Sequence, residues 1–239
     1  AAGLALALWA APLLSQSNAP IYPSYDGWVP NEDGSFTLVF GYHSENSVPV
    51  TVPAGPDNGF VPGPDDRGQP VVLQPGRHRN ACLIVVGPEF EGKNLQWRIG
   101  WAGKTVATTE RGGPDPLYRI EEINAAYRLA REIDTSQVER GVCINTPPTV
   151  FLRGEVEAEV GAPAPIQAFV NDDGLPRGST LSIGWKKLSG PGEVTFRDGS
   201  TAAPTAIFAA AGEYEIEVTA SDGVESRSSS LRVRVSPGS

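Results

Sequence analysis

The sequence predicts an all-β protein with two β-sandwich domains joined by a helical connector and preceded by an apolar N-terminal segment. The 239 residues leave room for two ordinary domains. The 27 glycines and 22 prolines suit many short strands and turns. Several runs alternate strictly between apolar and polar residues, which is the period of strands with one buried and one solvated face. We assign residues 1–19 to the apolar segment, 20–111 to the N-terminal sandwich, 112–144 to the connector and 145–239 to the C-terminal sandwich.

The segment from Ala1 to Leu14 is apolar and carries no charged residue. It is shorter than the roughly 20 apolar residues that span a bilayer. It is therefore either part of a secretion signal cleaved after Ala19, or a retained anchor held by a membrane or by a partner's hydrophobic groove. We expect retention, and each large side chain that a membrane or partner buries would contribute on the order of 1.5–3 kcal/mol to the attachment. The predicted contact residues at this end of the chain are Leu6, Leu8, Trp9, Leu13, Leu14, Tyr22, Tyr25 and Trp28.

The region 20–111 carries the signals of about six strands. After a turn at Asp33-Gly34, Phe36 to Tyr42 alternates between large apolar residues and smaller ones. Further strands are predicted at residues 48–52, 71–73, 81–86, 95–101 and 105–109. The aromatic row that includes Trp97 and Trp101 is expected in the core, with an exposed binding strip as the alternative. Residues 53–70 form a long proline-rich loop, which we expect to contact a partner.

The connector has a different pattern. Asp115 precedes Pro116, which suits an N-cap and a first-turn proline. Apolar residues then recur at helical spacing, at Leu117, Ile120, Ile123, Tyr127, Ala130 and Ile133. This predicts an amphipathic helix over 116–133, which packs on its own domain or docks on another protein.

The chain contains two cysteines, Cys82 in a predicted strand and Cys143 just before the C-terminal domain. Outside the cytosol an even number of cysteines suggests a disulfide. The alternative is two small buried apolar side chains. A disulfide would clip the connector onto the first domain and fix the angle between the domains.

The C-terminal region contains the clearest strands. Residues 213–220 place Tyr214, Ile216 and Val218 on one face and glutamates on the other, and Leu231 to Val235 alternates with arginines. Opposite charges on the two solvated faces predict ion pairs across neighbouring strands.

A longer series of residues in this region runs in a defined order. The series is Asn145-Thr146-Pro147-Pro148-Thr149-Val150, Asp172-Asp173-Gly174-Leu175-Pro176, Trp185, Ser189-Gly190-Pro191-Gly192, Phe208, Tyr214 and Ala220-Ser221-Asp222-Gly223. In order and spacing it resembles a PKD-like domain, an immunoglobulin-like β-sandwich module found outside cells. The resemblance implies an extracytoplasmic protein whose modules space, stack and bind. The string from Asn31 to Tyr42 also resembles a motif of uncharacterised secreted bacterial proteins with PKD-like tails, and this implies no activity.

The resemblance also raises a metal site, because some PKD-like domains bind calcium near such loops. Asp172, Asp173 and Asp222 are the candidate ligands, since hard cations favour clustered carboxylates. The alternative is that these residues only form turns.

Catalytic signals are absent from the sequence. His43 and His78 lack metal-ligand spacing, and no phosphate-binding loop, dinucleotide fingerprint or nucleophile motif occurs. The net charge of −9 argues against nucleic acid as a partner. We therefore expect no cofactor and no enzymatic activity.

These observations favour a non-enzymatic extracytoplasmic scaffold or tether subunit in the periplasm or on the cell surface. Protein partners and membrane contact through the N-terminal segment are expected. One setting is an energy-transducing membrane complex, such as a photosynthetic reaction centre with its antenna. The alternatives are a cell-surface carbohydrate-binding or adhesion module and an extracellular filament subunit.

Overall fold

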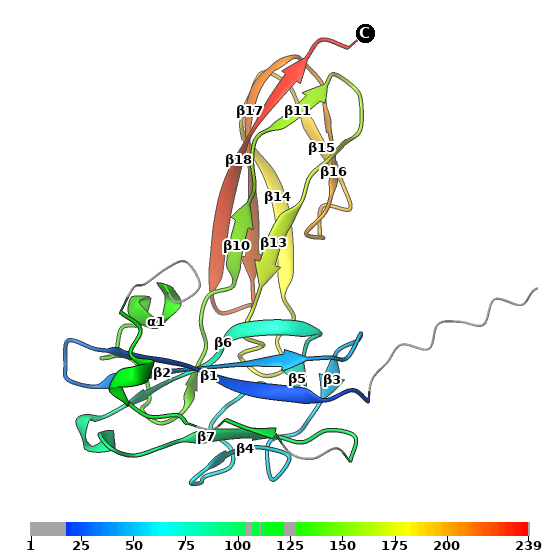
Figure 1. Cartoon of the computed structure of the whole chain (residues 1–239). Helices are drawn as coiled ribbons and strands as arrows, with labels where there is room; N and C mark the ends of the chain where they lie inside the picture. Colours follow the sequence, from blue (N-terminus) through cyan, green and yellow to red (C-terminus); the bar gives the residue numbers. More distant parts are fainter. Residues whose placement is uncertain (1–17, 104–106, 110, 122–127, 239) are drawn as a thin grey trace, which may run out of the picture.

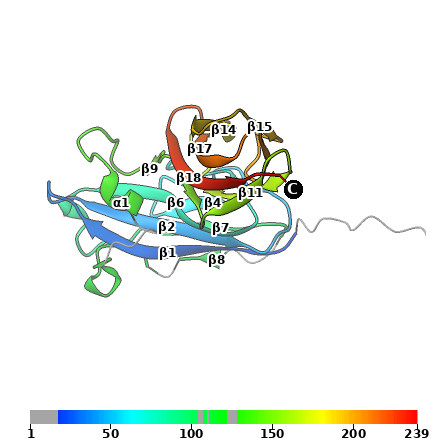
Figure 2. The ribbon, with the colours of Figure 1, turned by 90° about the horizontal axis from the view of Figure 1, so that it is seen from above.

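The computed structural model describes residues 18–103, 107–109, 111–121 and 128–238. It consists of two β-sandwich-like regions, with the C-terminal one standing on the N-terminal one (Figure 1). Seen from above, the C-terminal domain lies over β6, and β1 lies at the opposite edge of the same sheet (Figure 2). The predicted all-β class is therefore confirmed.

The N-terminal domain contains a four-stranded sheet, a three-stranded sheet and a short two-stranded ribbon. The four-stranded sheet has the order β1 (Ile21–Pro30), β2 (Phe36–Ser44), β6 (Gly76–Val86) and β9 (Cys143–Ile144), the three-stranded sheet has the order β4 (Asn58–Val61), β7 (Gln96–Ile99) and β8 (Ala107–Thr108), and the ribbon pairs β3 (Val50–Thr51) with β5 (Val72–Leu73). A short 3-10 turn, η1 (Pro88–Phe90), connects β6 to β7.

Strands β1 and β4 differ from the prediction. No strand was predicted before Phe36, but β1 runs for ten residues and contains two prolines. A proline is tolerated there because β1 is an edge strand. The predicted loop 53–70 contains β4, so it is not one continuous loop.

The core of the N-terminal domain lies between its two larger sheets. Phe40, Phe60 and Trp97 are fully buried, and the rings of Phe60 and Trp97 stack with centroids 5.7 Å apart. The indole N–H of Trp97 donates to Asn58 Oδ1 at 2.9 Å, so the buried polar atom is paired. The prediction that this aromatic row forms core is therefore confirmed for Trp97.

The C-terminal domain is built from three sheets that form the two layers of a sandwich. One layer contains the pair β10 (Thr149–Leu152) and β13 (Ala168–Asn171) and the sheet β12 (Ala164–Pro165), β16 (Thr205–Phe208) and β15 (Val194–Arg197), and the other has the order β11 (Val156–Glu159), β18 (Ser226–Ser236), β17 (Gly212–Ser221) and β14 (Ser182–Ser189). Tyr214, Ile216 and Val218 on β17 are buried as predicted. On the solvated face, Glu217 pairs with Lys186 at 2.8 Å, a cross-strand ion pair whose cation the sequence analysis did not name.

The predicted helical connector is wrong. Asp115 caps only a 3-10 turn, η2 (Pro116–Tyr118), because Arg119 is extended and Ile120 N–H donates to the Trp28 carbonyl at 2.9 Å. The α-helix of the described residues is α1 (Arg128–Glu132), and Ile123 and Tyr127 lie outside the described residues. Leu117 is 85% exposed, so it does not belong to a buried stripe.

The apolar residues of this stretch that are buried pack on their own domain. Ile120, Leu129 and Ala130 form a small cluster with Val29, Val39 and Leu83 on the outer face of the sheet β1–β2–β6. Of the two alternatives for the connector, packing on its own domain is the one that the described residues support.

Candidate functional site

A disulfide in the N-terminal sheet lies directly before the start of the C-terminal domain. Cys82 in β6 and Cys143 in β9 form a disulfide, with their Cα atoms 4.9 Å apart. The predicted disulfide is therefore confirmed. It ties the strand immediately before the C-terminal domain to the central sheet of the N-terminal domain.

A loop of the C-terminal domain, residues 172–178, fills the other side of the junction. Its Leu175 is 4% exposed and belongs to the hydrophobic core of the N-terminal domain. Gly174 precedes it with φ +82, and a Cβ there would lie 3.3 Å from the Pro70 side chain. A glycine therefore allows both the left-handed turn and the close approach that insert Leu175.

An arginine fixes the same loop to the segment 62–70 of the N-terminal domain. The two terminal nitrogens of Arg177 donate to the two carboxylate oxygens of Asp66 at 3.0 and 2.7 Å. Its Nε donates to the Gln69 carbonyl at 2.8 Å. A guanidinium fork suits such a paired contact. The segment predicted to contact a partner thus contacts the C-terminal domain of its own chain.

Asp173 lies at the centre of the junction and is 7% exposed. Its carboxylate accepts hydrogen bonds from the N–H and hydroxyl of Thr146 at 2.7 and 2.8 Å and from the Leu175 N–H at 2.8 Å. Burial raises the pKa of Asp173 to about 7, although these hydrogen bonds act in the opposite direction. Asp173 therefore holds the entry of the C-terminal domain to the loop that carries Leu175.

The calcium prediction is not supported. No group of three or more His, Cys, Asp or Glu side chains within the described ranges is placed to hold a metal ion. Asp222 Oδ1 accepts the N–H groups of Val224 and Glu225, and its Oδ2 accepts from Asn145. Asp172 accepts from the Gly174 N–H, and burial raises its pKa. Asp173 is also hydrogen-bonded, so these three carboxylates stabilise turns and the domain junction.

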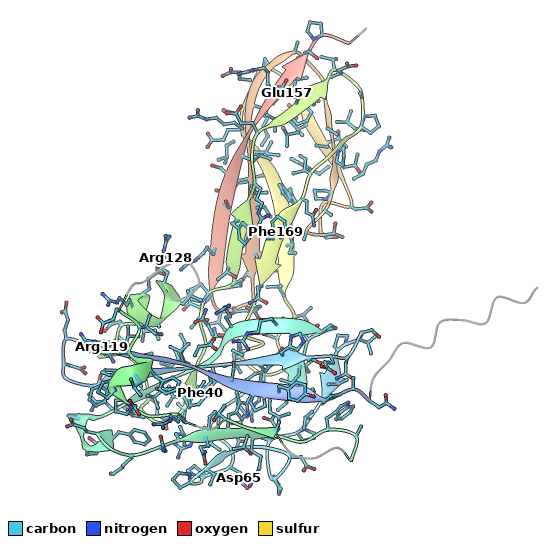
Figure 3. All side chains as sticks on the ribbon, viewed as in Figure 1. Phe40, Asp65, Arg119, Arg128, Glu157 and Phe169 are labelled. Carbon is cyan, nitrogen blue, oxygen red and sulfur yellow. A yellow bond between two sulfur atoms is a disulfide. The ribbon has the colours of Figure 1, made fainter. Side chains whose placement is uncertain are left out.

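A groove with a volume of about 520 Å³ lies beside the junction. Its lining comes from both domains and includes Arg77, Arg79, Leu129, Thr149, Phe151, Phe169, Val170 and Asp172. Phe151 and Phe169 are paired across β10 and β13, and their rings stack with centroids 4.9 Å apart. They are 46% and 36% exposed. Figure 3 shows Phe169 on the C-terminal domain above β6.

The predicted partner-contact residues fall into three groups. Leu6, Leu8, Trp9, Leu13 and Leu14 lie outside the described residues. Tyr22 is 45% exposed on the edge strand β1. Tyr25 and Trp28 are internal: the Tyr25 hydroxyl donates to the Gly113 carbonyl, and the Trp28 indole donates to the Asp115 carbonyl, both at 2.8 Å. Trp28 is a core residue, so the structure corrects its assignment as a contact residue.

The start of the described chain is held by an asparagine. Asn46 accepts from the Ala19 N–H at 2.8 Å and donates to the Ala19 carbonyl at 3.0 Å. Both residues are buried. Ala19 is therefore part of the folded domain. Within the described ranges, no helix has the length and apolarity needed to cross a bilayer.

The residues that line the groove and part of the junction were not predicted from the sequence. Leu175 was recognised only as part of a family motif, and Arg177, Phe151 and Phe169 were not singled out. One signal was present for Leu175, because a large apolar residue between Gly174 and a proline in a polar turn requires a hydrophobic contact. Nothing in the sequence pairs Phe151 with Phe169, which are 18 positions apart.

The geometry of the C-terminal domain defines an immunoglobulin-like sandwich, with a parallel pairing of β11 with β18 beside antiparallel strands. Residues 152–235 match the family model of the PKD domain. This part of the chain is a PKD domain, as its motifs predicted.

Several solved structures are similar to this chain or to part of it. The PKD domain from human KIAA0319 is 20% identical, with 43% of this chain and 93% of that chain covered and a TM-score of 0.32. The PKD domain from the KIAA 1837 protein is 18% identical, with 41% and 95% covered and a TM-score of 0.29. Tandem Ig repeats of Dlar are 12% identical, with 93% and 100% covered and a TM-score of 0.29. These likenesses carry no argument about partners.

The disulfide and the PKD domain together indicate an extracytoplasmic location. Disulfides persist in oxidising compartments and are rare in the cytosol.

Proposed function

We propose that this chain is a non-enzymatic extracytoplasmic scaffold or tether subunit of a membrane-associated protein assembly. The observation that carries the proposal is the interlocked junction. A buried leucine and an arginine fork join two sandwiches that have separate cores, and a disulfide fixes the strand from which the C-terminal sandwich begins. A flexible linker would suffice for two independent binding modules. A junction of this kind supports a role in which one domain is held at a fixed angle to the other.

The chemistry of the described residues is consistent with a structural role. Both cysteines are used in the disulfide. His78 stacks on Tyr42, and its Nε2 contacts the Pro75 carbonyl at 3.0 Å. Burial lowers the pKa of His78. Membrane attachment through residues 1–17 remains a prediction, because these residues lie outside the described ranges.

The proposal is tested by changing the junction in the full chain. Leu175→Ala combined with Arg177→Gln should leave the C-terminal sandwich folded but broaden the distribution of distances between spin labels placed on the two domains. The same variant, expressed in the native host, should recover less of the co-purifying assembly than the wild type. The matched control is Leu188→Ala, an exposed leucine on β14.

Two results would contradict the scaffold role. One is a broad distance distribution in the wild-type protein, since the junction would then not hold the domains. The other is hydrolysis of a polysaccharide or peptide by the pure protein, which would overturn the non-enzymatic interpretation.

One observation favours a carbohydrate-binding module as a second candidate. The exposed Phe151–Phe169 pair offers apolar surface in an open groove, and exposed apolar patches mark binding sites. Titration with neutral and acidic oligosaccharides tests this candidate directly.

A further inference from the structure

A cation that has no carboxylate partner among the described residues lies next to the two phenylalanines of the groove. Arg153 lies directly after β10, and its guanidinium carbon is 4.7 Å from the Phe169 ring centroid and 5.7 Å from that of Phe151. Among the described residues, it makes no hydrogen bond or ion pair. The side chain is therefore positioned by cation–π contacts, while its N–H donors remain available.

The acidic groups on the lining are turned into the junction. The Asp173 carboxylate accepts hydrogen bonds from Thr146 and Leu175, and the Asp172 carboxylate accepts one from the Gly174 N–H. Two further arginines line the groove: Arg77 pairs with Asp26 at 2.6 Å, and Arg79 also has an interaction partner. Arg153 thus adds a positive charge without a carboxylate partner next to the groove, in a chain whose net charge is −9. A ligand complementary to it carries a carboxylate, which matches the guanidinium fork.

The aromatic pair adds an apolar contact to this charge. Each ring has one face against the other ring, and Arg153 lies over Phe169. Ring faces on which a sugar would stack are thus partly occupied, while both rings still contribute exposed apolar surface to the groove. This arrangement suits an apolar side chain next to an acidic one. The walls come from two domains whose relative position the junction fixes.

We propose that this groove binds an extended acidic segment of a partner protein. A carboxylate of the segment binds Arg153, and an apolar side chain packs on Phe151 and Phe169. The proposal rests on the proposed scaffold function and names the kind of partner that the scaffold holds. Aromatic and arginine side chains are the types that most often dominate interface energies.

The test uses the purified full chain and fluorescence anisotropy. The probe is a short fluorescein-labelled peptide of alternating Glu and Leu, and the control peptide carries Lys in place of Glu. The variants are Arg153→Gln and Phe169→Ala. The matched control is Arg197→Gln, an exposed arginine on β15, far along the chain from the groove lining. Circular dichroism confirms that each variant is folded.

The wild type should bind the Glu peptide but not the Lys peptide. Arg153→Gln should weaken binding by about fivefold or more, the effect of removing an interface residue worth over 1 kcal/mol, and Arg197→Gln should leave it unchanged. Equal binding by Arg153→Gln, or no binding of the Glu peptide, would overturn the proposal. So would Arg153-dependent binding of oligogalacturonate with no peptide binding, since the ligand would then be an acidic glycan.

Failure of this proposal and failure of the scaffold function can be told apart. If Arg153→Gln has no effect on the peptide while the junction variant still loses the assembly, the scaffold stands and the groove is not its binding site. If the wild-type domains move freely, the scaffold fails irrespective of the peptide result.

Discussion

Leu175 should contribute more to stability than any other contact between the two domains. It belongs to the C-terminal domain in sequence but is 4% exposed within the N-terminal core. Truncation of a buried leucine to alanine costs about 2–5 kcal/mol, because transfer and cavity terms add. The ion pair between Arg177 and Asp66 has side chains that are 30% and 56% exposed, and pairs of this kind contribute about 0–1 kcal/mol. The leucine should therefore outweigh the ion pair.

The assay is urea unfolding of Leu175→Ala in a Trp185→Phe background, so that tryptophan fluorescence no longer reports on the C-terminal domain. With a urea slope of about 2 kcal/mol per M, a loss of about 3 kcal/mol lowers the midpoint of the N-terminal transition by about 1.5 M. Leu188→Ala, at an exposed position, should shift it by much less.

The result that refutes this argument is specific. If Leu175→Ala moves the midpoint no further than Leu188→Ala, the leucine does not fill the N-terminal core. If only the C-terminal transition moves, followed by circular dichroism, Leu175 stabilises its own domain rather than the junction.

Further predictions concern the disulfide, the junction carboxylate and the clamp at the start of the domain. Replacing Cys82 and Cys143 by Ala should lower the unfolding free energy by about 4 kcal/mol for a closed loop with a sequence separation of 61; alkylatable thiols in the native protein, found by mass spectrometry, would contradict it. Burial raises the pKa of Asp173 to about 7, above its unfolded value near 4, so the native state binds the proton more tightly. The unfolding free energy should thus fall as the pH rises from about 4 to 7, and Asp173→Asn should remove that part of the slope; an unchanged slope would count against it. Asn46→Ala should cost about 1–3 kcal/mol in thermal unfolding, because buried backbone groups of Ala19 lose their partners. N-terminal sequencing should find no mature chain that lacks Ala19.

The sequence predicts the PKD domain well because its signals are local. The alternation at Tyr214, Ile216 and Val218 predicts which face of the strand is buried, and these three residues are buried on β17. The disulfide was also predictable, since two cysteines permit only one intramolecular pairing. The strand predicted at residues 81–86 is also present, as the apolar half of β6, and it is buried on both faces.

The failed predictions share a physical reason. The stripe around Leu117 and Ile120 has helical spacing, but a tertiary bond from Ile120 to the edge strand β1 overrides local propensity and leaves Leu117 in solvent. Trp28 and Tyr22 look equivalent in sequence. The structure buries the first and exposes the second, because the register of β1 shifts between Tyr25 and Gly27 and interrupts the alternation along the strand. Periodicity does not state which neighbour will cover a residue.

The junction shows the same limit and explains why the candidate site could not be predicted. In sequence, Asp173, Gly174 and Leu175 form part of a turn, and acidic turn residues in an extracytoplasmic module suggest a calcium ligand. In the structure the acid accepts hydrogen bonds from the domain entry, the glycine passes Pro70, and the leucine enters the other domain. Each residue type suits both roles. What decides between them is the surface packed against the turn, and that surface is supplied by residues roughly 100 positions earlier in the chain. A PKD domain whose corresponding loop lacks the leucine should therefore move independently of its neighbour, and grafting the loop 172–178 onto it should not by itself create the junction, because the cavity that receives Leu175 belongs to the N-terminal domain.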